Sequence, residues 1–322
     1  MADIQLTIGH VLRHAPAASA MGREAAIVDV AQDLLLRHLF GQGALDAVVF
    51  KGGTALRKLY AGERGRFSTD LDFAVRDLAD DSASVVSLLA DEITGVEVGP
   101  FRYGITVRRG KRHLTIDSEL GNVEQLSSKL DVNPPPWLPP QLRSWVPMKI
   151  HERYGGPLPQ LAVMRLEENM AEKVSRLNRT TTARDVYDLV WIARVWRRSA
   201  GAEVDWELVR RLAVLKMWVD LHGVSSAQAT WKSSHGATAF DVERWLRVRR
   251  GAEFDDENIG LLAVPSPSLD ELGEQLAVDY AFLGELDEQE VVVARSHGAA
   301  RDLVLEMLAD LPGGRLARGA CW

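Results

Sequence analysis

The sequence contains a single cysteine, Cys321, next to its C-terminus. One cysteine excludes an internal disulfide and a zinc site built from several thiolates. The sequence also lacks any apolar run of the roughly 18 residues that a membrane span requires. Its first residues lack the basic and apolar regions of a signal peptide. We therefore expect a cytoplasmic protein that has no membrane partner.

An excess of positive charge is also missing, because 38 Lys and Arg residues stand against 45 Asp and Glu, a formal net charge of -7. The overall electrostatic field therefore does not favour nucleic acid, and binding of RNA would require a local basic patch. Two stretches of sequence are candidates for such a patch: Arg102, Arg108, Arg109, Lys111 and Arg112, and Arg244, Arg247, Arg249 and Arg250.

The spacing of apolar residues predicts an α+β protein of two domains. Five prolines between Asn133 and Pro140 interrupt regular structure, and we place the domain boundary shortly afterwards, near Gly156. The domain of residues 1–155 is expected to hold a small mixed sheet, with helices over 19–40, 54–60 and 84–93, strands over 47–50, 71–75, 103–108 and 113–119, and an edge strand over 145–150. The domain of residues 156–322 is expected to be all helical, with helices over 161–177, 183–196, 206–221, 240–248, 268–286 and 291–311.

Two glycines, Gly52 and Gly53, follow the first predicted strand and precede a helix. Paired glycines at such a turn let the backbone approach a ligand, and the N–H groups of the helix start favour a phosphate. Thr54 is expected either to cap this helix or to contact the same phosphate. The segment is not a Walker P-loop, because the Gly-x-x-x-x-Gly-Lys-Ser/Thr pattern is absent.

Two carboxylates, Asp70 and Asp72, lie two residues apart on the second predicted strand, so they point to the same face. Neighbouring carboxylates repel each other unless a cation lies between them. Mg²⁺ suits this arrangement, because it binds one or two carboxylates together with substrate phosphates. We therefore predict that Asp70 and Asp72 bind Mg²⁺ or Mn²⁺ and an NTP at this strand.

These motifs resemble those of the AbiEii/MenT-type nucleotidyltransferase toxins, which belong to the DNA-polymerase-β-like superfamily. The resemblance rests on Lys51-Gly52-Gly53-Thr54, on Ser68-Thr69-Asp70-Leu71-Asp72-Phe73, on Glu172-Lys173 and on Arg184-Asp185-Val186-Tyr187-Asp188. The four segments occur in family order over roughly residues 45–195. The resemblance implies a polymerase-β-like domain followed by a helical domain that completes the active-site cleft.

The resemblance also implies roles for individual residues. Asp70, Asp72, Lys173 and Asp185 would be catalytic, and Gly52, Gly53, Thr54, Ser68 and Lys173 would bind the nucleotide. Lys173 shares a helix face with Asn169 and Arg176, so an ion-paired surface helix is the alternative for this segment. Asp117 is the candidate third metal ligand on its strand, and Glu119, on the same face, is the alternative.

The activity implied is transfer of a nucleoside monophosphate from an NTP to an RNA, with a tRNA 3′ end as the expected acceptor and pyrophosphate as the product. A cognate antitoxin encoded nearby is implied as the protein partner. The alternatives are a nucleotidyltransferase that modifies a small molecule or a protein, and a non-catalytic module that binds NTP or RNA. His10 and His14 have the spacing of zinc ligands, but no Glu follows His10 and we assign no zinc site.

Overall fold

A computed structural model describes residues 4–14, 20–120, 124–177, 183–199, 204–222, 268–296 and 299–313 of the chain. These residues form two compact units. The described residues up to 136, together with 140–164, form the first unit, and residues 137–139 belong to the second unit with the described residues from 165 to 313. None of the helices in these described ranges is long and apolar enough to cross a membrane.

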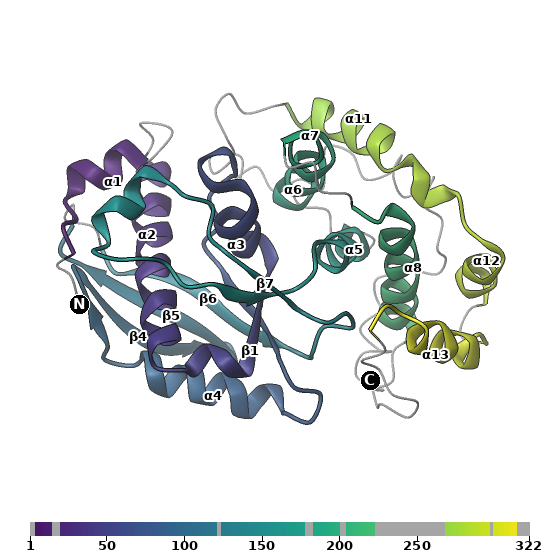
Figure 1. The fold of residues 1–322 in the computed structure, drawn as a ribbon, viewed down its shortest axis with the longest axis horizontal. Helices are drawn as coiled ribbons and strands as arrows, with labels where there is room; N and C mark the ends of the chain where they lie inside the picture. The colour runs from purple at the N-terminus through teal and green to yellow at the C-terminus, as the bar shows by residue number, and fades with distance from the viewer. Residues whose placement is uncertain are drawn as a thin grey trace. The chain divides into compact units, whose positions relative to one another are not determined.

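The first unit is a mixed sheet with helices packed on it (Figure 1). Its helical segments are α1 (Ile8–His14), α2 (Ala20–Gly41), η1 (Ala44–Ala47), α3 (Gly52–Leu56), η2 (Arg57–Ala61), η3 (Gly62–Arg64), α4 (Ser82–Ile93) and η4 (Lys149–Arg153). Its strands are β1 (Val48–Lys51), β2 (Leu71–Val75), β3 (Glu97–Val98), β4 (Phe101–Arg108), β5 (Lys111–Ser118), β6 (Leu126–Asn133), β7 (Gln141–Arg143) and β8 (Leu161–Val163).

The sheet has eight strands in the order β3-β4-β5-β6-β2-β1-β8-β7. Strand β1 is antiparallel to β2 and parallel to β8, and β2 is parallel to β6. All four residues of β1 are buried, because the strand has neighbours on both sides and helices against its face. The mixed sheet is confirmed, although eight strands make it larger than the small sheet that we expect from the sequence.

Helices α2 and α4 cover one face of this sheet, since both contact β6 and they contact each other (Figure 1). The apolar residues that predict α2, such as Ile27, Leu34 and Leu35, are fully buried. The same helix also buries two carboxylates, Asp29 and Asp33. The ammonium of the equally buried Lys58 lies between them, 2.9 Å from Asp29 Oδ1 and in contact with Asp33 Oδ1.

The described part of the second unit is built from helices. They are α5 (Leu166–Leu177), α6 (Ala183–Trp191), η5 (Ile192–Trp196), α7 (Arg197–Ser199), α8 (Trp206–His222), α11 (Leu269–Asp279), η7 (Ala281–Gly284), α12 (Glu288–Arg295) and α13 (Arg301–Ala309). The predicted helix over 240–248 lies outside the described residues, as does the basic cluster from Arg244 to Arg250. The all-helical domain expected over 156–322 is not confirmed, because β8 (Leu161–Val163) lies within these bounds and part of the remainder is not described.

The segment that follows β6 differs most from the sequence-based expectation. Residues 145–150 form no edge strand, and their last two residues begin η4 instead. The predicted helix over 161–177 starts only at Leu166, because Leu161–Val163 form β8 and the Met164 N–H donates to the Phe50 carbonyl at 3.0 Å. Since β8 still pairs with β1, the chain leaves the first unit after Met164, beyond the boundary that we place near Gly156.

Candidate functional site

The turn between β1 and α3 brings the backbone of Gly52 against the Asp72 side chain. Gly52 has φ +77°, a conformation that side chains disfavour, and a Cβ atom there would lie 2.5 Å from Asp72 Oδ2. Strand pairing produces this approach, because Lys51 lies opposite Asp72 in the β1–β2 register. Only glycine at position 52 therefore leaves room for the carboxylate at this edge of the sheet, where β1 ends and β2 begins.

Two polar side chains lie close to the Gly53 backbone. A Cβ atom at this residue would lie 2.5 Å from Arg66 Nη2 and 3.0 Å from Ser68 Oγ. Both side chains are buried, and Arg66 Nη1 also donates to the Phe67 carbonyl at 3.0 Å. The structure thus places Ser68 beside Gly53, as expected for one nucleotide site, and adds Arg66, a phosphate-binding type of side chain that the sequence analysis does not single out.

The Thr54 side chain faces the interior of the first unit. It is fully buried, and its hydroxyl donates to the carbonyl of Asp70, with the Ser68 carbonyl 3.4 Å away. Thr54 makes no capping hydrogen bond, because Lys51 occupies the N-cap position of α3. The hydroxyl of this α3 residue therefore holds the backbone that leads into β2.

A third carboxylate, Asp131, lies beside Asp72 on the neighbouring strand. The parallel β2–β6 register pairs Asp72 with Asp131, so their side chains share a face of the sheet. Asp131 forms an ion pair with Lys129 and is about one-third exposed. Asp70, one residue before β2, is half-buried, as is Asp72. This edge of the sheet therefore carries three carboxylates in two adjacent strands.

Asp117 is not part of this edge. In the β5–β6 register Arg112 lies opposite Leu130, so Asp117 is five residues, or about 17 Å, further along β5. Its carboxylate is exposed and accepts a hydrogen bond from Gln125 Nε2 at 2.9 Å.

Glu119, the alternative to Asp117, lies just beyond the same end of β5, where its N–H donates to the Pro100 carbonyl. The structure brings Asp131, rather than either predicted residue, next to Asp72.

The donor set at this edge fits a Mg²⁺ ion that is held jointly by protein and substrate. Within the described residues, no three His, Cys, Asp or Glu side chains gather closely enough to hold a metal by themselves. Mg²⁺ does not need such a cage, because it is usually bound by one or two carboxylates and completes its octahedron with water and phosphate oxygens. Asp70 and Asp72 supply hard oxygen ligands of this kind.

In the second unit, Lys173 on α5 contacts two carboxylates of α6. Its Nζ lies 2.9 Å from Asp185 Oδ1 and 2.8 Å from Asp188 Oδ2, and all three side chains are buried. The half-exposed Arg176 lies 3.6 Å from the other oxygen of Asp185. The structure therefore brings together Lys173 and Asp185, two of the residues that the sequence analysis singles out, and adds Asp188 as a second partner of the ammonium.

Comparison with known proteins assigns this arrangement to a family. The family model described as "Nucleotidyl transferase AbiEii toxin, Type IV TA system" matches residues 33–275, which include Gly52, Asp70, Asp72, Lys173 and Asp185. The chain belongs to the AbiEii family. No curated protein matches the chain.

The AbiEii assignment agrees with the fold. MenT4, a nucleotidyltransferase toxin from Mycobacterium tuberculosis H37Rv, is similar to this chain at a TM-score of 0.81 and 33% sequence identity, over 96% of this chain and 100% of MenT4. The protein is therefore an AbiEii/MenT-type nucleotidyltransferase toxin of a type IV toxin–antitoxin system. Family membership implies an NTP substrate, a divalent metal ion and a cognate antitoxin.

Proposed function

We propose that the protein transfers a nucleoside monophosphate from an NTP to the 3′ end of a tRNA in the cytoplasm, with release of pyrophosphate. The observation that supports this most directly is the approach of Gly52 to the Asp72 carboxylate. It places the N–H groups at the start of α3, which favour phosphate, beside the carboxylates that suit Mg²⁺. A nucleoside triphosphate carries the groups that both of these would bind.

The residues at this edge have separate tasks in the proposed reaction. Asp70 and Asp72 would hold Mg²⁺ or Mn²⁺, which neutralises charge on the transferring phosphate and the leaving pyrophosphate. Gly52 and Gly53 offer backbone N–H groups to the phosphates, and the Ser68 hydroxyl and the Arg66 guanidinium lie beside Gly53 to contact the same groups. Thr54 is buried, and its hydroxyl would keep the Asp70 backbone in place through the hydrogen bond to the Asp70 carbonyl.

Lys173 is proposed to bind the triphosphate, and Asp185 to act as a base or to position Lys173. In the structure two carboxylates hold the Lys173 ammonium, so a triphosphate would have to replace at least one of them. Lys173→Met is therefore expected to raise KM for the NTP more than tenfold, since a charge-assisted contact contributes about 1.5–3 kcal/mol. Asp185→Asn is expected to lower kcat. Urea unfolding of both variants separates these effects from a loss of folding.

The experiment that tests the proposal is a labelling assay. Purified protein is incubated with total tRNA, Mg²⁺ and each α-labelled NTP in turn, beside Asp70→Ala and the matched variant Asp117→Ala. Asp117→Ala also removes one carboxylate from the sheet, but from its exposed far end. We expect label to enter tRNA with one NTP, to persist in Asp117→Ala and to be lost in Asp70→Ala.

Other results would overturn the proposal in distinguishable ways. Label that enters a protein or a small molecule, but no tRNA, would contradict the RNA acceptor and retain the transferase. Growth arrest that persists in Asp70→Ala would support a non-catalytic module that binds NTP or RNA. Expression that confers antibiotic resistance, without arresting growth, would support an enzyme that modifies small molecules.

A further inference from the structure

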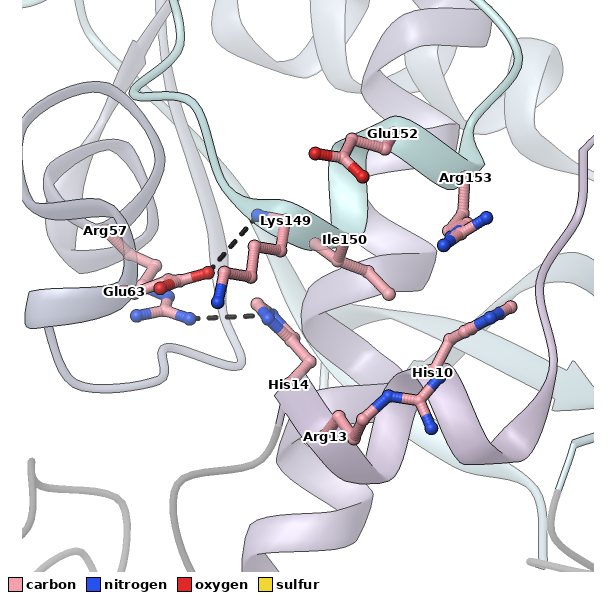
Figure 2. A pocket seen from close by; sticks show the side chains of 9 residues that line it. All are labelled: His10, Arg13, His14, Arg57, Glu63, Lys149, Ile150, Glu152 and Arg153. Carbon is pink, nitrogen blue, oxygen red and sulfur yellow. Dashed lines mark hydrogen bonds between the residues drawn. The ribbon is translucent and has the colours of Figure 1, made fainter.

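The first unit contains a pocket of about 720 Å³ whose lining shares no residue with the edge described above (Figure 2). Helix α1, the η2–η3 segment and η4 surround it. Its walls include the cationic side chains Arg13, Arg57, Lys149 and Arg153, together with His10 and His14. Two carboxylates, Glu63 and Glu152, complete the charged lining. A surplus of positive charge in one pocket is notable in a chain whose formal net charge is -7.

Three of these cations have no carboxylate partner among the residues that the structure describes. Arg13, Arg153 and the Lys149 ammonium form no ion pair there. Arg13 comes from α1, and the other two come from η4. Figure 2 shows the Arg13 and Arg153 side chains with His10 on one side of the pocket and Lys149 on the opposite side. Like charges that line one pocket repel each other, and an anion between them relieves the repulsion.

The two carboxylates do not neutralise this set. Four Lys and Arg side chains line the pocket against two carboxylates, and one of these, Glu63, accepts a hydrogen bond from the Lys149 N–H at 3.2 Å. In Figure 2 the Glu152 carboxylate lies above Ile150 on η4, apart from Arg13 and His10. The part of the pocket between Arg13, Lys149 and Arg153 therefore stays electropositive.

The inner wall is held in place by a buried carboxylate. Asp29 Oδ2 lies 2.8 Å from His14 Nε2 and 3.4 Å from Arg57 Nη2, and all three side chains are at most 3% exposed. Arg57 Nη1 also donates to the Gly65 carbonyl at 2.8 Å and to the Gly62 carbonyl. The wall is thus organised before any ligand arrives, which lowers the entropic cost of binding.

We propose that this pocket is a second ligand site of the protein, which binds a phosphate-bearing molecule through Arg13, Lys149 and Arg153. Phosphate is favoured over a single carboxylate, because three cations line this part of the pocket, and a phosphate carries more negative charge and more acceptor oxygens than one carboxylate. The volume lies in the range of small-molecule sites, so more than one phosphate group fits. Two sources share this chemistry: a free polyphosphate or nucleotide, and the phosphates of an RNA strand.

The site is also connected to the Asp70 edge by one short segment. Arg57 holds the Gly62 and Gly65 carbonyls, and the chain continues directly to Arg66, Ser68 and Asp70. The binding itself does not depend on the proposed transfer reaction, since it requires neither the metal nor Asp70.

The test measures binding without turnover. The full chain is titrated in EDTA with inorganic triphosphate by calorimetry, and with a fluorescent single-stranded RNA of ten nucleotides by anisotropy. The test variant is Arg13→Gln/Lys149→Gln. The matched control is Arg295→Gln/Arg301→Gln, which also removes two positive charges, from exposed positions of the second unit that do not line the pocket.

We expect the test variant to weaken triphosphate binding at least about tenfold, the equivalent of one lost charge-assisted contact, and the control to change it less than twofold. Weakened triphosphate binding with unchanged RNA binding assigns a free phosphate ligand. Weakening of both assigns the phosphates of an RNA strand. Equal effects of the two double variants, or no binding of either probe by the wild type, would overturn the proposal.

If the double variant Arg13→Gln/Lys149→Gln does not fold, a single variant still tests the proposal. Lys149 is exposed and its ammonium makes no ion pair within the described residues, so Lys149→Gln alone is expected to keep the urea midpoint of the wild type. This single variant is then compared with Arg301→Gln, which also removes one exposed positive charge, in the same titrations. Failure of the tRNA labelling assay leaves these titrations unaffected, so the two proposals are overturned by different results.

Discussion

The Gly52 backbone and the Asp72 carboxylate lie so close that a Cβ atom on residue 52 would be 2.5 Å from Asp72 Oδ2. The Asp72 Cβ and Cγ atoms would also lie within 3.2 Å of it, so the carboxylate cannot simply rotate away. The contact ties the identity of residue 52 to the position of a proposed metal ligand. It also offers a direct test of the site.

Gly52→Ala is expected to abolish most of the transferase activity, because the added methyl group displaces the Asp72 carboxylate. The matched control is Gly110→Ala. Gly110 has a similar φ of +74°, but nothing lies within 4 Å of its added Cβ. Both variants lose about 1–3 kcal/mol of stability to backbone strain. Urea unfolding should show a loss of stability in both variants, at least as large in Gly52→Ala because of its additional clash, and labelling assays should show a loss of activity in Gly52→Ala alone. Comparable activity of the two variants would contradict the interpretation.

Thr54→Val is expected to destabilise the first unit by about 0.5–1.5 kcal/mol, because the fully buried Thr54 side chain loses its hydrogen bond to the Asp70 carbonyl. Thr54→Ser keeps the hydroxyl and should stay closer to the wild type. Thr94→Val serves as the control, since Thr94 donates to the Ala90 carbonyl at an exposed helix end. If Thr54 instead contacts only a phosphate, Thr54→Val will raise KM for the NTP and leave the urea midpoint unchanged.

Asp131→Asn is expected to lower kcat about 10- to 100-fold and to raise the Mg²⁺ concentration required for half-maximal activity. Asp131 lies beside Asp72 in the β2–β6 register, so it contributes negative charge to the edge that is proposed to hold the metal. Asp117→Asn removes a carboxylate from the far end of β5 and should leave both quantities unchanged. A larger effect of Asp117→Asn would restore the role that the sequence suggests for it.

Acid is expected to destabilise the first unit through Asp29. Burial raises the pKa of this carboxyl, but the charges of Lys58 and Arg57 and the His14 hydrogen bond outweigh it and hold the pKa well below the ordinary value. The folded state therefore keeps Asp29 charged when the unfolded chain, with a pKa near 3.9, takes up a proton. This contribution to stability is present above about pH 4 and is lost as the pH falls toward the lower folded pKa.

The measurement is the free energy of unfolding in urea from pH 7 to pH 3. Between pH 5 and pH 3 the wild type should lose stability more steeply than Asp29→Asn, which has no carboxyl to titrate. The variant is expected to be less stable at pH 7 by about 3–5 kcal/mol, because Lys58 and Arg57 lose a buried partner. Parallel slopes for the two proteins would show that Asp29 is not the titrating group.

Local sequence patterns are sufficient to predict the elements that bear the chemistry. The apolar period of α2, the alternation in β2 and the glycines after β1 depend on neighbours within a few residues, and the structure confirms these elements. Asp70 and Asp72 are predicted for the same reason, since two residues of strand determine their common face. Their role in the reaction stays a prediction.

Pairing between distant segments is what the sequence does not predict. Strand β6 precedes the proline-rich segment and lacks a clear alternation, yet it pairs with β2 and carries Asp131. Strand β8 has only three residues, too few to distinguish a strand from the start of α5. Arg66 is also recognised only through its approach to Gly53, because no local pattern separates it from a solvated arginine.

The proline-rich segment has a consequence for how this chain emerges from the ribosome. Residues 137–139 belong to the second unit, although the residues before and after them belong to the first. The Trp137 and Leu138 N–H groups donate to the fully buried Glu168, at 2.8 and 2.9 Å, and Glu168 also binds Lys216 at 2.9 Å. During synthesis the Trp137 segment is exposed before its acceptor and the cation that balances it have been made. In a chain arrested before Lys216, burial of Glu168 would leave its negative charge without this cation. We therefore expect the second unit to fold only after α8 has been translated.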